Sequence, residues 1–203
     1  PAHRGSVGTR EEPTMTVVHV AAAPDLADSV FVEDLAIVVD EVAIITRPGS
    51  ESRRQECEAV AEVLSRYRPL RSIGPPGTLD GGDVLRLGRT LYVGLSTRTN
   101  EDGARQLATE LAPLGYSVEC VRTSGCLHLK SAVTALDSNR VLCNPAWIDP
   151  SGFERVGVHV PRQVRRLHET AGDRPGHAEA RALNGAAVRV EEATRDGSEA
   201  WVV

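Results

Sequence analysis

Residues 34–47 read DLAIVVDEVAIITR, two apolar runs joined by the polar pair Asp40-Glu41. Two short apolar runs separated by two polar residues are typical of a β-hairpin. Residues 83–96, DVLRLGRTLYVGLS, and residues 131–144, SAVTALDSNRVLCN, repeat this design. The offset between corresponding hairpins is about 48 residues, a length that indicates a supersecondary unit copied along the chain.

The first two hairpins are followed by patterns typical of amphipathic helices. Residues 51–68 and 104–111 place apolar side chains at helical spacing, and Asn100 or Thr99 is suited to cap the second helix. Residues 116–121, YSVECV, then read as a strand. We predict units of strand, strand, helix and strand. One unit cannot bury both faces of its sheet, so the copies should pack into one α+β domain.

The composition narrows the class of protein. The 203 residues carry a formal net charge of -5, which argues against a nucleic-acid partner and is compatible with a cationic small-molecule substrate. No apolar run approaches the roughly 18 residues of a membrane span, and residues 1–6 lack the apolar core of a secretory signal. The four cysteines form no C-x-x-C pair, so we expect reduced thiols in a cytoplasmic protein.

Acidic residues stand beside the apolar strands at repeated positions. Asp28, Glu33 and Asp34 precede the first hairpin, and Asp80 and Asp83 precede the second. Carboxylates that meet at a common centre need a cation, and a guanidinium matches them with paired hydrogen bonds. The alternative is that these are ordinary turn residues, because Asp and Gly dominate turns for backbone reasons.

Arg53 and Arg98 follow the two hairpins at equivalent places. They are either solvated loop residues or a clamp for a substrate carboxylate. His128 lies between Leu127 and Leu129 at the start of a predicted strand. It is either a structural histidine or, if it faces the acidic centre, a general acid–base group that Asp80 would orient.

Six ordered motifs resemble the dimethylarginine dimethylaminohydrolases, and together they cover roughly residues 17–160. The motifs are residues 28–34 (DSVFVED), 45–49 (ITRPG), 52–54 (SRR), 78–85 (TLDGGDVL), 93–100 (VGLSTRTN) and 127–131 (LHLKS). They occur in the family's order and with its spacing. The resemblance implies a pentein-type α/β propeller, in which ββαβ modules surround a central channel. Three modules are clear here, at about residues 28–75, 78–122 and 127–160.

The resemblance also implies roles for individual residues, with no metal and no organic cofactor. His128 matches the family's catalytic histidine and Asp80 its acidic partner. The matches for binding the guanidinium and amino ends of the substrate are Asp28, Glu33 and Asp34. The matches for binding its α-carboxylate are Arg53 and Arg98. The implied reaction hydrolyses a methylated arginine to citrulline through attack by a cysteine thiolate, with His128 acting first as acid and then as base.

The chain departs from the family pattern in one respect. The family nucleophile is a cysteine close to the C-terminus, and this sequence has none after Cys143. We therefore expect an incomplete or altered gene product, with a catalytic domain at residues 16–160 flanked by atypical segments 1–15 and 161–203. Its open sheet edges should favour a homo-oligomer.

Two points stay open in the sequence. Cys126 would share a strand face with His128 and is the first alternative nucleophile, whereas Cys57, Cys120 and Cys143 are expected to be core thiols. The alternative functions are an arginine deiminase or an amidinotransferase of the same fold, and a non-catalytic pentein that binds an arginine-like ligand.

Overall fold

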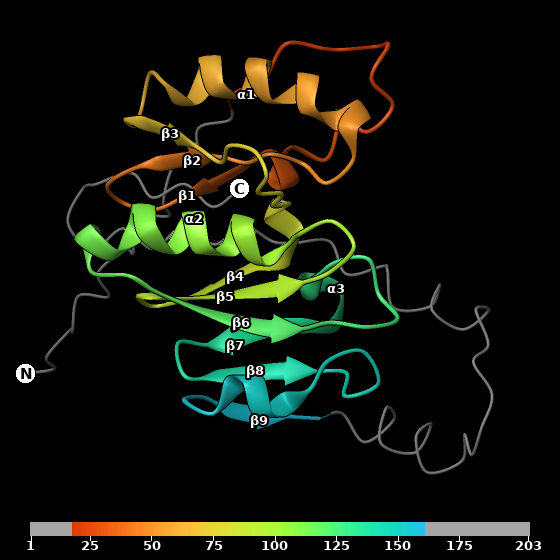
Figure 1. Cartoon of the computed structure of the whole chain (residues 1–203), viewed down its shortest axis with the longest axis vertical. Coiled ribbons are helices and arrows are strands. Elements are labelled where there is room, and N and C mark those ends of the chain that lie inside the picture. The colour runs from red at the N-terminus through yellow and green to blue at the C-terminus, as the bar shows by residue number, and fades with distance from the viewer. Residues whose placement is uncertain (1–17, 161–203) are drawn as a thin grey trace, which may run out of the picture.

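The computed structural model describes residues 18–160, which form three stacked three-stranded sheets (Figure 1). In each sheet the first two strands pair antiparallel and the third joins the second in parallel. All three predicted hairpins are present. The strands are β1 (Ala36–Val38), β2 (Ala43–Ile45) and β3 (Leu70–Ser72); β4 (Val84–Leu87), β5 (Thr90–Leu95) and β6 (Ser117–Arg122); and β7 (Val133–Asp137), β8 (Arg140–Cys143) and β9 (Gly157–His159).

The first two units contain the predicted helix and the third does not. A 3-10 helix η2 (Glu51–Glu56) runs into α1 (Cys57–Leu64), and α2 (Glu101–Leu111) continues into η4 (Ala112–Leu114). Between β8 and β9 there is only the 3-10 turn η5 (Pro150–Phe153). Two prolines, Pro145 and Pro150, lie in this connection, and a proline cannot donate the backbone hydrogen bond that a helix interior requires.

Helix α2 is fixed at both ends by local chemistry. Asn100 is its N-cap, because the side-chain oxygen accepts a hydrogen bond from the Gly103 backbone N–H at 2.8 Å. The same oxygen accepts from the Thr78 N–H at 3.0 Å, which joins the helix to the loop before the second sheet. Gly115, at a φ of 80°, ends the helical segment in the left-handed conformation that glycine tolerates.

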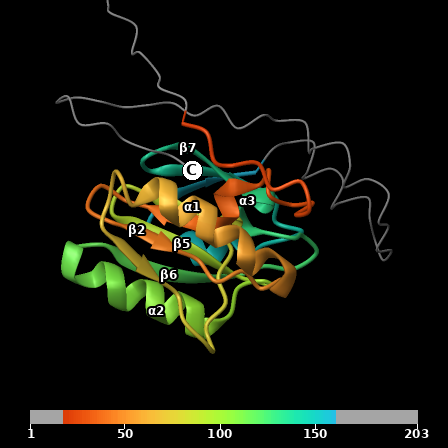
Figure 2. The same ribbon diagram turned by 90° about the horizontal axis from the view of Figure 1, so that it is seen from above.

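Apolar side chains join the sheets face to face. Leu107 and Leu111 of α2 are fully buried, and they pack in one cluster with residues of the first and second sheets. Figure 2 shows from above that α2 runs beside β6. A second cluster joins the second and third sheets, and in it the Tyr92 and Phe153 rings stack with centroids 4.5 Å apart. A third cluster packs α1 on the first sheet.

A short helical turn precedes the first strand of every sheet: η1 (Val32–Leu35), η3 (Gly81–Asp83) and α3 (Leu129–Ala132). The middle turn packs against the other two. A Cβ on Gly82 would lie 2.7 Å from Asp34 Oδ1 and 2.8 Å from His128 Cγ, so only glycine permits this approach. His128 was expected within a strand; it is instead the N-cap residue of α3.

The expected segments 1–15 and 161–203 lie outside the described residues. Within residues 18–160, no helix is long and apolar enough to cross a membrane.

We predict that Gly103→Ala destabilises the fold although alanine has the higher helix propensity. Propensity favours alanine by about 1 kcal/mol. The new Cβ would meet the Thr78 backbone, with its carbonyl carbon at 2.8 Å, and overpacking of this kind costs about 1–3 kcal/mol. Urea denaturation should show a lower free energy of unfolding. Thr109→Ala, at an exposed position of the same helix, is the control and should be neutral or stabilising. An equally stable Gly103→Ala variant would contradict the packing argument.

Candidate functional site

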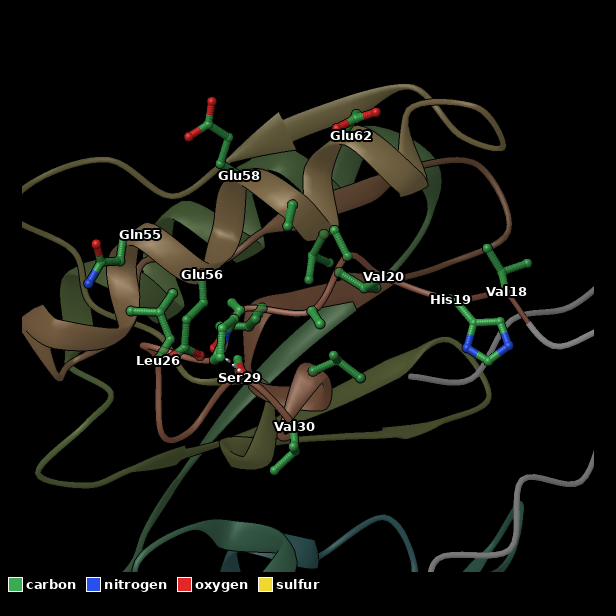
Figure 3. A pocket seen from close by; sticks show the side chains of 18 residues that line it. Val18, His19, Val20, Leu26, Ser29, Val30, Gln55, Glu56, Glu58 and Glu62 are labelled. Carbon is green, nitrogen blue, oxygen red and sulfur yellow. Dashed lines mark hydrogen bonds between the residues drawn. The ribbon is translucent and has the colours of Figure 1, made fainter.

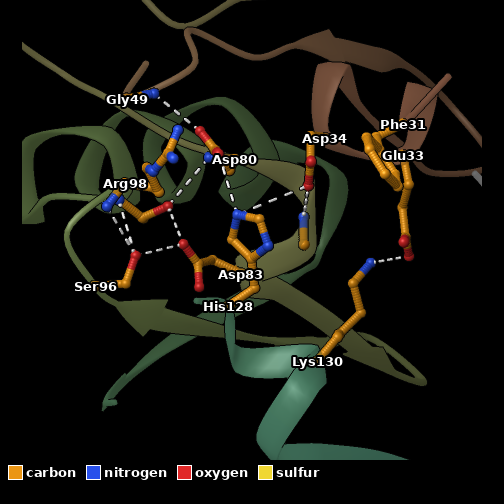
Figure 4. Close-up of polar contacts among 12 residues, drawn as sticks. Phe31, Glu33, Asp34, Gly49, Asp80, Asp83, Ser96, Arg98, His128 and Lys130 are labelled. Carbon is orange, nitrogen blue, oxygen red and sulfur yellow. Dashed lines mark hydrogen bonds and ion pairs between the residues drawn. The ribbon is translucent and has the colours of Figure 1, made fainter. Parts of the chain in front are cut away.

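His128 and Asp80 form a hydrogen-bonded pair where the second and third units meet (Figure 4). The distance from His128 Nε2 to Asp80 Oδ2 is 3.1 Å, and the Asp80 side chain is fully buried. The other carboxylate oxygen of Asp80 accepts from the Gly49 N–H at 2.9 Å. The backbone N–H of Asp80 donates to Thr99 Oγ1 at 3.0 Å. The Gly49 N–H of the first unit therefore holds the carboxylate, and Thr99 of the second unit holds the backbone of the same residue.

Asp34 brings a second carboxylate to the same imidazole. Its Oδ1 lies 4.0 Å from His128 Nε2 and accepts from the Gly82 N–H at 2.9 Å. Its Oδ2 accepts from the guanidinium of Arg53 at 2.5 Å. Each of the three helical turns thus contributes one polar group, and the three groups come from parts of the chain more than 40 residues apart.

This surrounding charge raises the pKa of His128. Burial alone would lower it, because burial disfavours the charged imidazolium. The hydrogen bond to Asp80 and the charges of Asp34 and Asp83 outweigh burial, so the net shift is upward. The site therefore favours the protonated imidazolium more than water does, and this is the form that can donate a proton.

Asp83 has a supporting place behind the histidine. Its Oδ1 accepts from the Leu129 N–H at 2.8 Å, at the start of α3, and Oδ2 accepts from the hydroxyls of Ser96 and Thr99, both at 2.7 Å. Burial raises the pKa of Asp83, although these hydrogen bonds oppose the rise. Asp83 therefore anchors the turn that carries His128. The sequence places this residue among the repeated acids but does not indicate its role.

The expected role of Arg53 in binding a ligand carboxylate stays a prediction, and in this structure its guanidinium already has partners within the protein. Its side chain is buried and ion-paired with Asp34 and Glu56. One terminal nitrogen also donates to the backbone oxygens of Asp28 and Phe31, at 3.2 and 3.0 Å. Its guanidinium is thus engaged with the protein's own acceptors. The sequence could not reveal this, because the pattern SRR is the same whether the arginine points outward or inward.

Arg98 is placed differently. It is half-buried, and within residues 18–160 its guanidinium has no hydrogen-bond or ion-pair partner. Its backbone lies against Gly49, whose Cβ would fall 2.6 Å from Arg98 Cα. Because Gly49 donates to Asp80, this contact holds the Arg98 backbone close to the loop that supports the histidine pair.

The remaining two expected residues are not in the His128 cluster. Glu33 forms an ion pair with Lys130, which sequence reasoning missed even though Lys130 lies in the LHLKS motif. The Asp28 side chain is exposed and makes no hydrogen bond or ion pair with the described residues, although its backbone oxygen accepts from Arg53.

The cysteines lie apart from this chemistry. Cys57 and Cys143 belong to apolar clusters, as expected, whereas Cys120 is exposed on β6, so its assignment to the core was wrong. Cys126 lies in a bend before α3 and shares no strand face with His128. Burial, with a contribution from the Asp83 charge, raises the pKa of Cys126 to about 11.

Asp34, Asp80 and His128 each offer an atom within 4.8 Å of the others, a donor set that is compatible with a metal ion. In this protein the same atoms already have partners. Gly82 and Arg53 donate to Asp34, and Gly49 donates to Asp80. The cluster is therefore satisfied by hydrogen bonds and ion pairs from the protein.

A cavity of about 740 Å³ lies on the outer side of the first unit, between residues 18–32 and the η2–α1 segment (Figure 3). Its lining is mainly apolar and includes Val20 and Leu26. Glu56 also lines it and pairs with Arg53, but neither His128 nor Asp80 borders it. The cavity is therefore separate from the histidine cluster.

The chain is similar in sequence to a known family and to known enzymes. A family model described as arginine deiminase matches residues 4–175, which extends beyond both ends of the motif resemblance. The dimethylarginine dimethylaminohydrolase of Streptomyces coelicolor is 49% identical over 148 residues, covering 72% of this chain and 57% of that protein. The enzyme of the same name from Pseudomonas aeruginosa is 41% identical over 133 residues, covering 64% and 52%.

Solved structures show the same fold. A cysteine-to-serine mutant of the Pseudomonas aeruginosa enzyme, complexed with citrulline, superposes with a TM-score of 0.63 at 38% identity and covers 68% of this chain and 55% of that chain. The N-terminal domain of ArgZ, an arginine dihydrolase, superposes with a TM-score of 0.63 at 19% identity. The match covers 73% of this chain and 58% of that chain, and at this identity it supports the fold alone. The chain spans about half the length of the relatives it matches. It belongs to the arginine deiminase family of pentein proteins, and its sequence identifies it as a relative of the dimethylarginine dimethylaminohydrolases.

Proposed function

We propose that this chain carries the acid–base and guanidinium-binding groups for hydrolysis of an Nω-methylated arginine to citrulline and methylamine or dimethylamine. The observation that carries the proposal is the position of the His128 imidazole between the carboxylates of Asp80 and Asp34. The dimethylarginine dimethylaminohydrolase names of the relatives and the citrulline bound to one of them support the same substrate class.

His128 would act as acid and then as base. A cysteine thiolate attacks the guanidinium carbon and forms a carbon–sulfur bond. Protonated His128 donates its proton to the nitrogen of the departing amine, so the carbon–nitrogen bond breaks and a thiouronium intermediate remains. Neutral His128 then takes a proton from water, which attacks the same carbon and releases citrulline and the thiol. The raised pKa of His128 suits the first step.

Asp34 is the best candidate to receive the substrate guanidinium. Its Oδ2 already binds the guanidinium of Arg53, which demonstrates that its environment supports a charged guanidine, and its Oδ1 faces His128. A guanidinium near Oδ1 would bring its central carbon close to the imidazole. Carboxylates at this position keep the guanidine cationic and therefore electrophilic.

Arg98 is the candidate for the substrate α-carboxylate. Among the described residues its guanidinium has no partner, so it can form charge-assisted hydrogen bonds without breaking existing ones. Arg53 would have to leave Asp34 and Glu56 to do the same. We therefore assign Arg53 to the support of Asp34 and keep Asp28 as a secondary candidate for the substrate amino group.

Turnover by this chain requires that one of its four cysteines act as the nucleophile. Partial desolvation of the sulfur atom raises the pKa of all four thiols, so each stays protonated near neutral pH, and a thiol is a poor nucleophile. We expect the 203-residue chain to bind the ligand without turning it over, which is also the behaviour of a non-catalytic pentein.

A cytoplasmic location and a homo-oligomer are also proposed. All four cysteines are unpaired, as expected in a reducing compartment. Strands β3 and β9 are exposed along their whole length, and exposed strands of this kind favour pairing with another chain.

The function is tested by combining ligand binding with turnover on the full 203-residue chain. Asymmetric dimethylarginine should shift the His128 imidazole NMR resonances in a saturable way, with His128→Ala used to assign them. Citrulline release should be absent.

If the folded chain gives no saturable shift, the proposed site does not bind this substrate class. Citrulline release that depends on His128 would mean that one of the four cysteines is the nucleophile, with Cys126→Ala as the next variant. Tighter binding of unmethylated arginine would favour the deiminase alternative.

Asp80→Asn should lower the pKa of His128, measured by NMR titration of the imidazole. The variant loses the charge and weakens the hydrogen bond that hold the pKa up, while burial continues to lower it. The direction in which the His128–Asp80 pair changes the stability with pH follows from the direction of the pKa shift. Folding raises the pKa of His128, so the His128–Asp80 pair contributes fully to the free energy of unfolding when the pH is below the unfolded-state pKa of about 6.5. That contribution is lost as the pH rises through the folded-state pKa. Wild type and variant should therefore differ most at low pH. An unchanged pKa would contradict the role of Asp80.

The two arginines should respond in opposite ways to truncation. Arg53→Ala leaves the carboxylates of Asp34 and Glu56 without their buried cation, and breaking a buried pair costs about 3–5 kcal/mol. Arg98→Ala removes a guanidinium without partners and should change stability by less than about 0.5 kcal/mol. It should instead weaken ligand binding, measured by calorimetry with asymmetric dimethylarginine. If Arg98→Ala binds as well as wild type, the carboxylate clamp is wrong.

A further inference from the structure

An ion pair joins the first unit to the third beside the histidine cluster. Lys130 Nζ, from α3, binds Glu33 Oε1, from η1, although the two residues are 97 positions apart in the sequence. Figure 4 shows the pair next to Phe31, on the side of His128 that carries Asp34. Lys130 follows His128 by two residues and Glu33 directly precedes Asp34, so both partners adjoin the proposed catalytic groups.

Lys130 is the only lysine of the chain, and the other 22 of the 23 basic Lys and Arg residues are arginines. Lysine and arginine bind a carboxylate differently. An arginine can bind a carboxylate through two parallel hydrogen bonds in a fixed fork, whereas a lysine ammonium is a compact, strongly hydrated charge on a flexible stem. Lysine is therefore the cation that releases a carboxylate most readily.

The exposure of the pair supports exchange. The Lys130 side chain is 25% exposed and that of Glu33 is 39% exposed, in contrast to 6% and 10% for the ion pair of Arg53 with Asp34. Solvent-exposed ion pairs are weak, because water screens the charges and both side chains lose conformational freedom. Lys130 can swing into solvent without leaving a buried ammonium unpaired.

We propose that Lys130 is an exchangeable counter-ion that occupies Glu33 until a cationic group of the ligand replaces it. The inference rests on the proposed function, because it takes the ligand to be an arginine derivative. Lys130 thereby sets the affinity of the site for cationic ligands. It lowers that affinity by the free energy needed to separate it from Glu33.

The two possible substitutions at this position have opposite consequences. Lys130→Met keeps the length of the side chain and removes its charge, so Glu33 becomes free. Asymmetric dimethylarginine should then bind more tightly by up to about fivefold, the upper limit that corresponds to an exposed ion pair. Lys130→Arg should hold Glu33 with a fork and weaken binding. In the double variant Lys130→Met/Glu33→Gln the gain should disappear.

A second readout uses the fact that the chain has one lysine. Reductive methylation followed by peptide mass spectrometry reports the reactivity of the Lys130 amine, and the N-terminal amine lies on a different peptide. Saturating asymmetric dimethylarginine should increase the rate of Lys130 modification toward the rate in Glu33→Gln, because the ammonium is displaced into solvent.

The outcomes separate this inference from the proposed function. If the ligand shifts the His128 resonances but Lys130→Met does not tighten binding, or if Lys130 becomes less reactive when the ligand binds, the exchange is wrong and the proposed function stands. If the ligand leaves the His128 resonances unchanged in wild type and in Lys130→Met, both are wrong.

Discussion

The rest of the site depends on three carboxylates, those of Asp34, Asp80 and Asp83, which are buried where the units meet and must be surrounded by hydrogen-bond donors. A buried carboxylate is tolerated only when hydrogen-bond donors or cations surround it. Asp34 receives the Gly82 N–H, Asp80 receives the Gly49 N–H and Asp83 receives the Leu129 N–H. Every one of these bonds crosses from one unit to another. The need to satisfy the acids therefore links the units to one another, and it leaves two of the carboxylates, those of Asp34 and Asp80, facing one imidazole.

This arrangement separates the two sides of the proposed reaction. The acid–base side is complete within residues 18–160, because both the imidazole and its orienting carboxylate are held by the fold. The nucleophilic side is not, since the thiols are protonated and Cys126 lies outside the strand that would have brought it to His128.

Arg53 and Glu33 show that a sequence motif can place a residue near the site without revealing which side chain it pairs with. Both were expected to contact the substrate, and both adjoin Asp34 in space or in sequence. In the structure Arg53 forms an ion pair with Asp34, and Glu33 forms an ion pair with Lys130. In each case the partner belongs to a segment distant along the chain, and long-range pairing leaves no local pattern in the sequence.

The sequence by itself determined the repeated hairpins, the capped helix after Asn100 and the family. These depend on alternating apolar residues, on a side chain that caps its own helix and on ordered motifs, all of which are local. Only the tertiary structure decided that His128 begins a helical turn, that the third unit lacks its helix and that Arg53 is engaged. The reason is physical: a side chain's partners depend on which units pack against it, and that packing is set by the burial of distant surfaces.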